Sequence, residues 1–405
     1  MYGKGGDFGF KSRRVHMVKC CTSGYDPQED SRLLEKWVRQ YAKGKVLDMG
    51  TGSGIQAIAS AQSPRVNSVL AVDVQKGVID YCRKTIKNPK IKFRYSDLFS
   101  KVKGKFDTII FNPPYLPQEL KVLDVELEGG KKGYEVIERF LNDASLYFDK
   151  DGIILLVFSS LTRKSKVEEF IKSSLLEFEE LEKLHIFFED IYTYMLKKSE
   201  FLKELESNGV KNLKYFTKGK RGLLFTGTHK NRKIAVKAKN PQSHAFGRIK
   251  NEAKWLEKLN KYGIGPRLVL SNEDYLVCEF VEGDLILDYI KKSKKMQIKK
   301  VISGVLRQLF ILDKLKADKE EMHRPLKHII VRNNMPCMID FERMHFVKDP
   351  KNVTQFCQFL MNSKLNELLK SKGIKIDNSR LMGLAKVYKK NMNNMNLLKI
   401  TREVK

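Results

Sequence analysis

The chain has 405 residues, 42% of them hydrophobic, which is enough to bury the cores of two or three globular domains. Its formal net charge of +29 is uneven, because residues 1–200 contain 33 Lys and Arg against 28 Asp and Glu, whereas residues 201–405 contain 44 against 20. The basic second half predicts a surface for ribosomal or transfer RNA; the alternative is a lysine-rich surface that only keeps the protein soluble.

The cysteine pattern argues against a disulfide-rich or zinc-binding protein, and the apolar runs argue against a membrane-spanning or secreted one. The six cysteines form no CxxC pair, which excludes a disulfide scaffold or a zinc site of that spacing and suits free thiols in a reducing compartment. The longest nearly apolar run, residues 152–158, is too short to span a membrane, and the basic, Gly-rich start lacks the apolar core of a signal peptide. We expect a cytoplasmic protein with no membrane partner.

Residues 1–24 predict a flexible arm, and residues 25–198 alternate predicted strands and helices. The strands are expected at residues 45–49, 68–72, 92–95, 108–111, 153–158, 181–188 and 192–196. The helices are expected at residues 33–42, 55–62, 76–86, 134–147 and 166–175. This alternation predicts an α/β fold with a doubly wound seven-stranded sheet, whose last two strands form a hairpin.

A glycine-rich turn follows the first strand. Gly50, Gly52 and Gly54 lie between a strand and a helix, where they let the backbone approach a ligand and the helix N-terminus favours negative charge; the alternative is an ordinary tight turn. Asp73, at the end of the second strand, fits a ribose diol. Asp97, after the third strand, is either an acceptor for an adenine amine or a turn residue.

The segment Asn112-Pro113-Pro114-Tyr115 ends the fourth strand, since two prolines cannot donate to a sheet. Asn112 is therefore presented at the carboxyl end of a strand, where open α/β sheets bind ligands. The Asn112 side-chain oxygen and the Pro113 carbonyl would accept the two hydrogens of a planar NH2 group, and Tyr115 would give that group a flat wall. The alternative is a stiff turn with no chemical role.

Residues 20–198 resemble the class I S-adenosylmethionine-dependent methyltransferases. The resemblance rests on YDPQEDS near the start, VLDMGTGSG, VDV at 72–74, NPPYLP and EGGKKGYEVIERF. The block is most similar to the HemK/PrmC-type release-factor glutamine methyltransferases, in the archaeal and eukaryotic branch without the bacterial N-terminal helical domain. NPPY also occurs in adenine amino-methyltransferases, and the EGG…RF stretch favours glutamine.

The resemblance implies roles for individual residues. It implies that the cofactor, S-adenosylmethionine, contacts Asp48, Gly50, Gly52, Gly54, Asp73 and Asp97, that Glu29 and Asp30 close the pocket, and that Asn112, Pro113 and Tyr115 hold the substrate amide. The implied reaction is N5-methylation of the glutamine in the Gly-Gly-Gln loop of a class 1 peptide chain release factor, with a small zinc-binding activator subunit as partner.

Two other functions stay open for this block. One is an adenine N6-methyltransferase acting on RNA or DNA, with the basic second half gripping the nucleic acid. The other is a scaffold that retains only cofactor binding, which the intact motifs disfavour.

After a polar linker at residues 199–209, residues 210–405 begin with two or three antiparallel strands. Lys237 lies in the strand pattern IAVKAK, and Glu252 follows in a helical run, the arrangement that grips nucleotide phosphates in kinases; the alternative is a lysine on a solvated strand. Residues 210–360 resemble atypical protein kinases of the RIO and Bud type. This implies an α+β kinase-like domain with ATP and Mg2+ as ligands.

The kinase resemblance departs at the catalytic loop. Asp340 matches the metal-binding Asp, but one alignment places His328 at the metal-binding Asn and His323 at the catalytic Asp, and the other places Pro325 there. Three interpretations follow: an active kinase with His323 as base, a nucleotide-binding pseudokinase, or a basic docking module. Because Lys237, Glu252 and Asp340 are retained and the catalytic Asp is missing, we favour nucleotide binding over phosphoryl transfer.

Overall fold

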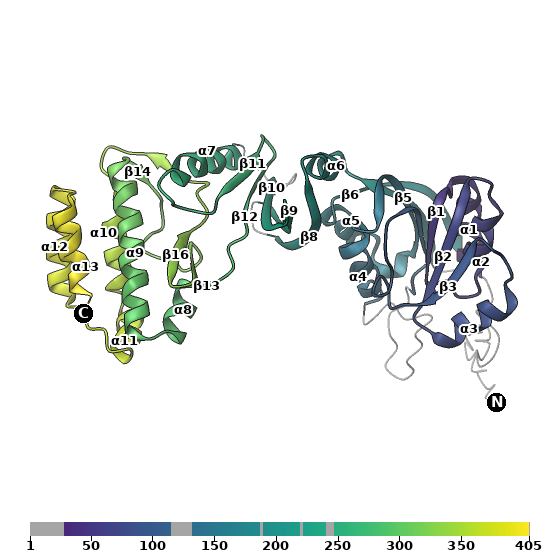
Figure 1. Ribbon diagram of the computed structural model, residues 1–405, viewed down its shortest axis with the longest axis horizontal. Coiled ribbons are helices and arrows are strands. Elements are labelled where there is room, and N and C mark those ends of the chain that lie inside the picture. The colour runs from purple at the N-terminus through teal and green to yellow at the C-terminus, as the bar shows by residue number, and fades with distance from the viewer. Residues whose placement is uncertain (1–27, 115–131, 187–188, 219–221, 240–246, 405) are drawn as a thin grey trace, which may run out of the picture. The chain divides into compact units, whose positions relative to one another are not determined.

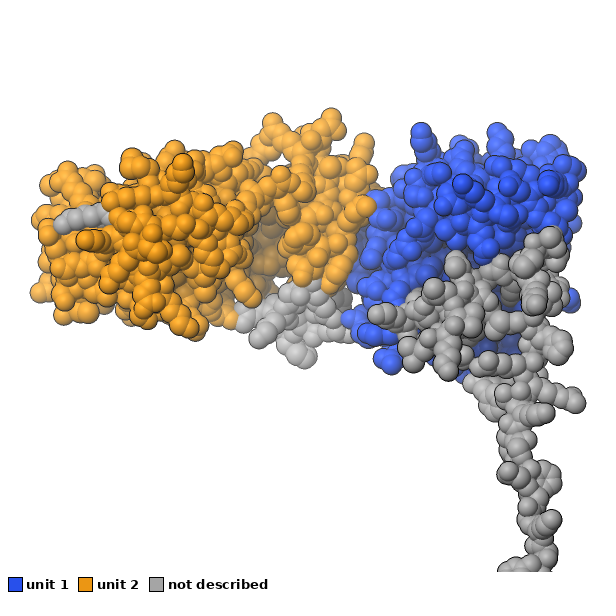
Figure 2. Space-filling view, turned by 90° about the horizontal axis from the view of Figure 1, so that it is seen from below, with its two compact units in different colours: residues 1–204 blue, residues 205–405 orange. Residues whose placement is uncertain are grey.

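The structure is a computed structural model that describes residues 28–114, 132–186, 189–218, 222–239 and 247–404. The chain divides into two compact units, residues 1–204 (unit 1) and residues 205–405 (unit 2), which are coloured separately in Figure 2. Within the described ranges, no helix combines the length and apolarity that a membrane span requires. Cys82, Cys278, Cys337 and Cys357 are free thiols, as predicted.

Unit 1 contains a seven-stranded sheet in the order β3-β2-β1-β4-β5-β7-β6. Its strands are β1 (Gly44–Met49), β2 (Val66–Asp73), β3 (Ile91–Tyr95), β4 (Phe106–Phe111), β5 (Phe148–Ser159), β6 (Leu176–Ile186) and β7 (Glu189–Lys198). β1 to β5 are parallel, while β7 is antiparallel to both β5 and β6. The predicted doubly wound sheet with a terminal hairpin is therefore confirmed.

Helices flank this sheet (Figure 1). They are α1 (Glu29–Tyr41), α2 (Ile55–Gln62), α3 (Lys76–Thr85), α4 (Glu135–Ala144) and α5 (Lys164–Ser173), with α6 (Glu200–Ser207) following β7. Helices cover both faces of the sheet, so the central strands are apolar on both faces. Ile109 and Ile110 of β4 are fully buried. The strand order reverses between β1 and β4, which creates the crevice where such sheets bind ligands.

Unit 2 begins with an antiparallel five-stranded sheet in the order β11-β12-β10-β9-β8, on which helix α7 (Arg248–Asn260) packs. The strands are β8 (Val210–Lys218), β9 (Gly222–His229), β10 (Arg232–Lys239), β11 (Leu268–Ser271) and β12 (Tyr275–Glu279). The antiparallel strands expected at the start of this half are therefore present.

A mostly helical part of unit 2 follows, built around the long helix α9 (Figure 1). Its helices are α8 (Ile286–Lys292), α9 (Lys295–Lys314), α10 (Asn352–Leu360), α11 (Ser363–Ser371), α12 (Asn378–Lys390) and α13 (Asn394–Glu403). Its short strands are β13 (Asp284–Leu285), β14 (Ala317–Asp318), β15 (Ile329–Arg332), β16 (Met335–Met338) and β17 (His345–Phe346). The pairing of β14 with β17 and of β15 with β16 brings the segments before His328 and after Met338 together.

Candidate functional site

A cavity of about 370 Å³ lies at the carboxyl ends of β1, β2 and β4 in unit 1. Gly50, Gly52, Asp73, Asp97 and Asn112 all line it, so the structure brings together residues predicted from four separate segments. The position matches the switch point of the sheet.

The glycine turn has the backbone conformation that only glycine adopts easily. Gly50, Gly52 and Gly54 have φ values of 65°, 50° and 83°. Gly54 is the N-cap of α2, and a Cβ atom there would lie 2.4 Å from Ile86 Cδ1. Gly54 therefore shapes the turn without lining the cavity, in contrast to the prediction that it contacts the cofactor.

Asp48 also lies behind the cavity wall, because its side chain is buried under the turn that it supports. The Thr51 hydroxyl donates to Asp48 Oδ2 at 2.6 Å, and the Thr51 amide donates to the Val72 carbonyl at 2.9 Å. Burial raises the pKa of Asp48 to about 7, although the Thr51 hydrogen bond opposes that rise. Asp48 is thus a support of the glycine turn and not a lining residue.

Asp73 faces the cavity with a carboxylate that is fixed by the backbone. The Gly52 amide donates to its Oδ2 at 3.1 Å and the Gln75 amide donates to its Oδ1 at 2.9 Å. Burial raises the pKa of Asp73, and these backbone hydrogen bonds oppose that effect. Each carboxylate oxygen has further lone pairs, so Asp73 fits a role as acceptor for two hydroxyl groups.

Asp97 is held by an ion pair that the sequence interpretation missed. The Arg139 guanidinium of α4 contacts Asp97 Oδ2 at 2.8 Å, and both residues line the cavity. Arg139 lies in the EVIERF segment, one helical turn after Glu135, so helical periodicity placed it on α4 but not beside Asp97.

Asn112 is oriented by the first turn of α1. Its Nδ2 donates to Asp30 Oδ2 at 3.0 Å and lies 3.2 Å from Ser31 Oγ. A carboxylate only accepts, so the amide nitrogen must face Asp30 and the oxygen must face away from it. Asn112 Oδ1 is buried and has no hydrogen-bond partner among the described residues. Asn112 is a lining residue of the cavity, and burial of this oxygen would be costly without a hydrogen-bond donor from a ligand.

The neighbouring predicted residues have different positions. Pro113 is buried and lines the cavity, and Tyr115 lies outside the described residues. Asp30 lines the cavity next to Asn112, whereas Glu29 is exposed and does not. The prediction that Glu29 closes the pocket is not matched by this geometry, because α1 turns that side chain to its outer face.

Several lining residues could not be singled out from sequence. Ser31, Gln75, Val78, Leu98 and Phe111 also line the cavity. The Phe111 ring packs on Phe140 of α4 at 4.5 Å between centroids. The one usable sequence signal for Phe111 is that it is an apolar residue at the end of a buried strand, next to a polar motif.

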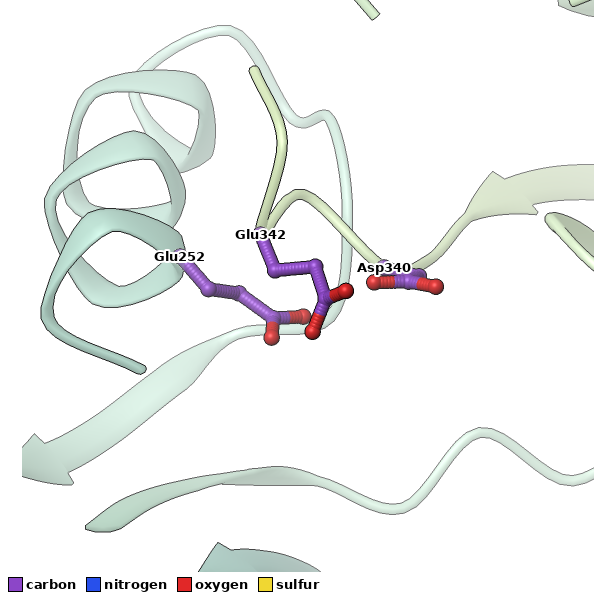
Figure 3. Close-up of side chains that lie close together, drawn as sticks. All are labelled: Glu252, Asp340 and Glu342. Atoms are coloured by element: carbon purple, nitrogen blue, oxygen red, sulfur yellow. The ribbon is translucent and has the colours of Figure 1, made fainter. Parts of the chain in front are cut away.

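A second cluster of charged residues lies in unit 2. Lys237 Nζ of β10 lies 2.5 Å from Glu252 Oε2 of α7, 3.4 Å from Asp340 Oδ1 and 3.6 Å from Glu342 Oε2. Figure 3 shows Glu252, Asp340 and Glu342, whose ligand atoms lie within 4.8 Å of one another. Burial alone would lower the pKa of Lys237, but Glu252 and Asp340 outweigh that effect and raise it. The predicted trio of Lys237, Glu252 and Asp340 is thus brought together.

The two predicted histidines differ. His323 is exposed and does not line the small cavity, of about 100 Å³, that Asp340 and His328 share. Burial lowers the pKa of His328, whose Nε2 lies 3.2 Å from Glu321 Oε2. Glu321, which neither alignment pointed to, lines this cavity and has a φ of 66°.

The comparisons with known proteins match unit 1. The family description "Methyltransferase small domain" matches residues 22–188. A relative from Methanocaldococcus jannaschii, called a putative protein N5-glutamine methyltransferase, is 34% identical over 174 residues, which cover 41% of this chain and 88% of the relative. The release factor glutamine methyltransferase of Streptococcus pneumoniae is 35% identical over 123 residues, 27% of this chain and 44% of that protein.

Among solved structures, the E. cuniculi Mtq2–Trm112 complex, described as responsible for methylation of the translation termination factor eRF1, is 24% identical with a TM-score of 0.36. The match covers 43% of this chain and 98% of that one. The chain thus spans almost the whole archaeal relative but less than half of the bacterial one. Through unit 1, this chain belongs to the methyltransferase small domain family.

Proposed function

We propose that unit 1 methylates the side-chain amide nitrogen of the glutamine in the Gly-Gly-Gln loop of a class 1 peptide chain release factor, with S-adenosylmethionine as the methyl donor. The observation that carries this proposal is the buried, unpartnered Asn112 Oδ1 at the wall of the cavity. The archaeal relative that is 34% identical bears an N5-glutamine methyltransferase name, which supports glutamine as the acceptor.

The lining residues fit S-adenosylmethionine. The Asp73 carboxylate, fixed by the amides of Gly52 and Gln75, suits a ribose diol, and Asp97 beside Arg139 suits the adenine end. When bound, the cofactor supplies an electrophilic methyl group, so no strong protein nucleophile is required.

Asn112 positions the amide nitrogen that accepts the methyl group. An amide nitrogen is a poor nucleophile, because its lone pair is delocalised into the carbonyl. Oxygen acceptors aimed at its hydrogens hold the NH2 group in place and favour the positive charge that develops on nitrogen as the new C–N bond forms. Asn112 Oδ1 is one such acceptor, and we propose the Pro113 carbonyl as the second. The bond between the methyl carbon and the cofactor sulfur would break as the C–N bond forms, S-adenosylhomocysteine would be the leaving group, and the nitrogen would lose one proton to solvent.

The proposal is tested with the whole chain, labelled S-adenosylmethionine, a purified release factor and structured RNA offered together. The expected result is label on the Gly-Gly-Gln glutamine. Label in the RNA, with the peptide unmodified, would instead support the adenine N6-methyltransferase.

We also propose a small zinc-binding activator subunit as partner, a cytoplasmic location, and contact of the basic half with ribosomal or transfer RNA. Copurification from cells tests the two proposed partners.

For unit 2 we infer that a nucleoside triphosphate with Mg2+ binds beside Lys237, in a kinase-like domain. The ion pair of Lys237 with Glu252 at 2.5 Å, next to Asp340, supports this inference. We expect ATP to raise the unfolding temperature of unit 2, and Lys237→Ala to remove that effect. Lys233→Ala is the matched control, since Lys233 is an exposed residue of the same strand. Equal protection in wild type and Lys237→Ala would contradict nucleotide binding.

A further inference from the structure

Gln56 is a second buried residue of the cavity in unit 1 that carries an oxygen without a partner. It is the second residue of α2, lines the cavity, and is 4% exposed. Its Oε1 atom is buried and makes no hydrogen bond with any described residue. An amide oxygen buried in this way costs free energy unless a ligand donates to it. The roles proposed for Asp73, Asp97 and Asn112 leave this oxygen unused.

The other amide atom of Gln56 is already bound within the protein. Gln56 Nε2 donates to the Ser31 carbonyl at 2.7 Å. Because a carbonyl oxygen only accepts, the Gln56 amide cannot be turned the other way round without losing this hydrogen bond. Oε1 is therefore an acceptor, and it suits a ligand group that has a hydrogen to donate.

Ser31 connects Gln56 with Asn112, the residue proposed to hold the methyl acceptor. Asn112 Nδ2 lies 3.2 Å from Ser31 Oγ and donates to Asp30 Oδ2 at 3.0 Å. The first turn of α1 thus contacts two amide side chains, one from α2 and one from the end of β4. Each of these side chains has its nitrogen bound and its oxygen buried without a partner among the described residues. Gln56 therefore belongs to the Asn112 end of the cavity.

The order of the strands separates this end of the cavity from the end proposed for the nucleoside. Asp97 follows β3 and Asp73 ends β2, whereas Asn112 follows β4, on the other side of β1. With the adenine beside Asp97 and the ribose beside Asp73, the amino-acid end of S-adenosylmethionine extends toward Asn112 and Gln56. This step rests on the proposed function of unit 1.

The charges around the cavity favour a cationic group as the donor. The described lining residues include four acids and one base, namely Asp30, Asp73, Asp97, Glu189 and Arg139, and the Arg139 guanidinium contacts Asp97 at 2.8 Å. A lining with net negative charge attracts cations. The amino-acid end of the cofactor has an ammonium group with three hydrogens to donate, whereas its carboxylate has none.

We propose that Gln56 Oε1 accepts a hydrogen bond from the α-ammonium group of S-adenosylmethionine, while Gln56 Nε2 holds the turn of α1 that orients Asn112. The same two helices, α1 and α2, then hold both the amino group of the cofactor and the residue that positions the methyl acceptor. Gln56 also gives the cavity a specificity that contacts to ribose and adenine alone do not, because it distinguishes the cofactor from an analogue without the amino group.

The test compares two ligands of the full-length chain by calorimetry: S-adenosylhomocysteine and its analogue without the α-amino group. We expect the wild type to bind the analogue at least about tenfold more weakly, since a hydrogen bond to a charged group changes an equilibrium by about that factor or more. Equal affinities would overturn this inference and leave the proposed methyl transfer intact. Absence of binding by both ligands would instead contradict the cofactor proposed for unit 1, and this inference with it.

A variant then assigns the contact to Gln56. Gln56→Met keeps the length of the side chain but removes both amide atoms, so we expect the affinity for S-adenosylhomocysteine to fall about tenfold or more. The affinity for the analogue should fall much less, which reduces the difference between the two ligands to below about threefold. Loss of the Ser31 hydrogen bond alone would weaken both ligands equally, so a difference as large as in the wild type would overturn the role of Gln56.

The matched control is Gln62→Met, because Gln62 is an exposed glutamine of the same helix. Both ligands should bind Gln62→Met with wild-type affinity. Circular dichroism establishes that each variant is folded. If Gln56→Met does not fold, the comparison of the two ligands on the wild type still decides whether the amino group is recognised.

Discussion

The Asn112 Nδ2 atom donates to Asp30 Oδ2 at 3.0 Å, which couples the first turn of α1 to the end of β4. Because this contact uses the amide nitrogen, Asn112 Oδ1 is left buried without a hydrogen-bond partner among the described residues. Asp30 is thus a positioning residue, 82 positions away in sequence from the residue it orients.

Replacing Asp30 with Ala should free the Asn112 carboxamide to rotate. A hydrogen bond to a charged group is worth about 1.5–3 kcal/mol, so we expect methyl transfer to slow by about 10-fold to 100-fold. The affinity for the cofactor should change less than threefold, since Asp30 contacts Asn112, the residue that holds the methyl acceptor. Glu29→Ala, an exposed neighbour, is the control and should behave as wild type. An equal loss in both variants would contradict this role, and calorimetry with S-adenosylhomocysteine gives the affinity.

Asp73→Asn should reduce cofactor affinity. The Asn side chain keeps one acceptor oxygen but loses the charge and half of the acceptor capacity, so we expect the dissociation constant to rise by about 10-fold to 100-fold. Asp80→Asn on the exposed side of α3 should leave it unchanged. Titration with S-adenosylhomocysteine measures both, and equal affinities would refute the assignment of Asp73.

Gly54→Ala should destabilise unit 1. A Cβ atom there meets Ile86 Cδ1 at 2.4 Å and imposes a φ of 83° on a residue with a side chain. We expect a loss of about 1–3 kcal/mol in the free energy of unfolding. Gly77→Ala is the matched control, because Gly77 lies in α3 with open space around it, and this change should be neutral or stabilising by up to about 1 kcal/mol. Urea titration separates the two; equal effects would be inconsistent with the steric account.

The free energy of unfolding should depend on pH through Asp48. Its pKa is raised by burial to about 7 in the folded state, against 3.8 ordinarily. Between these values the folded state binds more protons than the unfolded state, so this contribution to stability falls as pH rises from about 4 to about 7 and is constant above. Asp48→Asn should remove that fall. Parallel stability curves for wild type and Asp48→Asn would show that Asp48 is not the group responsible.

The sheet of unit 1 was predictable because its strands are short apolar runs between turn residues, and the burial of Ile109 and Ile110 follows directly from that pattern. The spacing of the motifs likewise predicted that Gly50, Asp73 and Asn112 lie at one edge of the sheet. Asp48 was misplaced because a motif residue can support a turn instead of facing the ligand. Arg139 and Ser31 were missed because their roles depend on distances between segments that periodicity does not give.

In unit 2, the pairing of Lys237 with Glu252 follows from a strand and the next helix, a local arrangement that sequence indicates. The position of Glu321 could not be predicted from the sequence in this way. It depends on a tight turn after β14, and no alignment could assign the length of that turn. A charge pattern alone cannot distinguish His323, which is exposed, from His328, whose Nδ1 is buried.

The most direct test of the central claim is a single-turnover measurement on Asn112→Ala, with the modified glutamine of the release factor quantified by mass spectrometry at saturating S-adenosylmethionine. Loss of the acceptor that holds the NH2 group predicts glutamine methylation slowed at least about 100-fold, with cofactor affinity nearly unchanged. Methylation of that glutamine by Asn112→Ala within threefold of the wild-type rate would contradict the account.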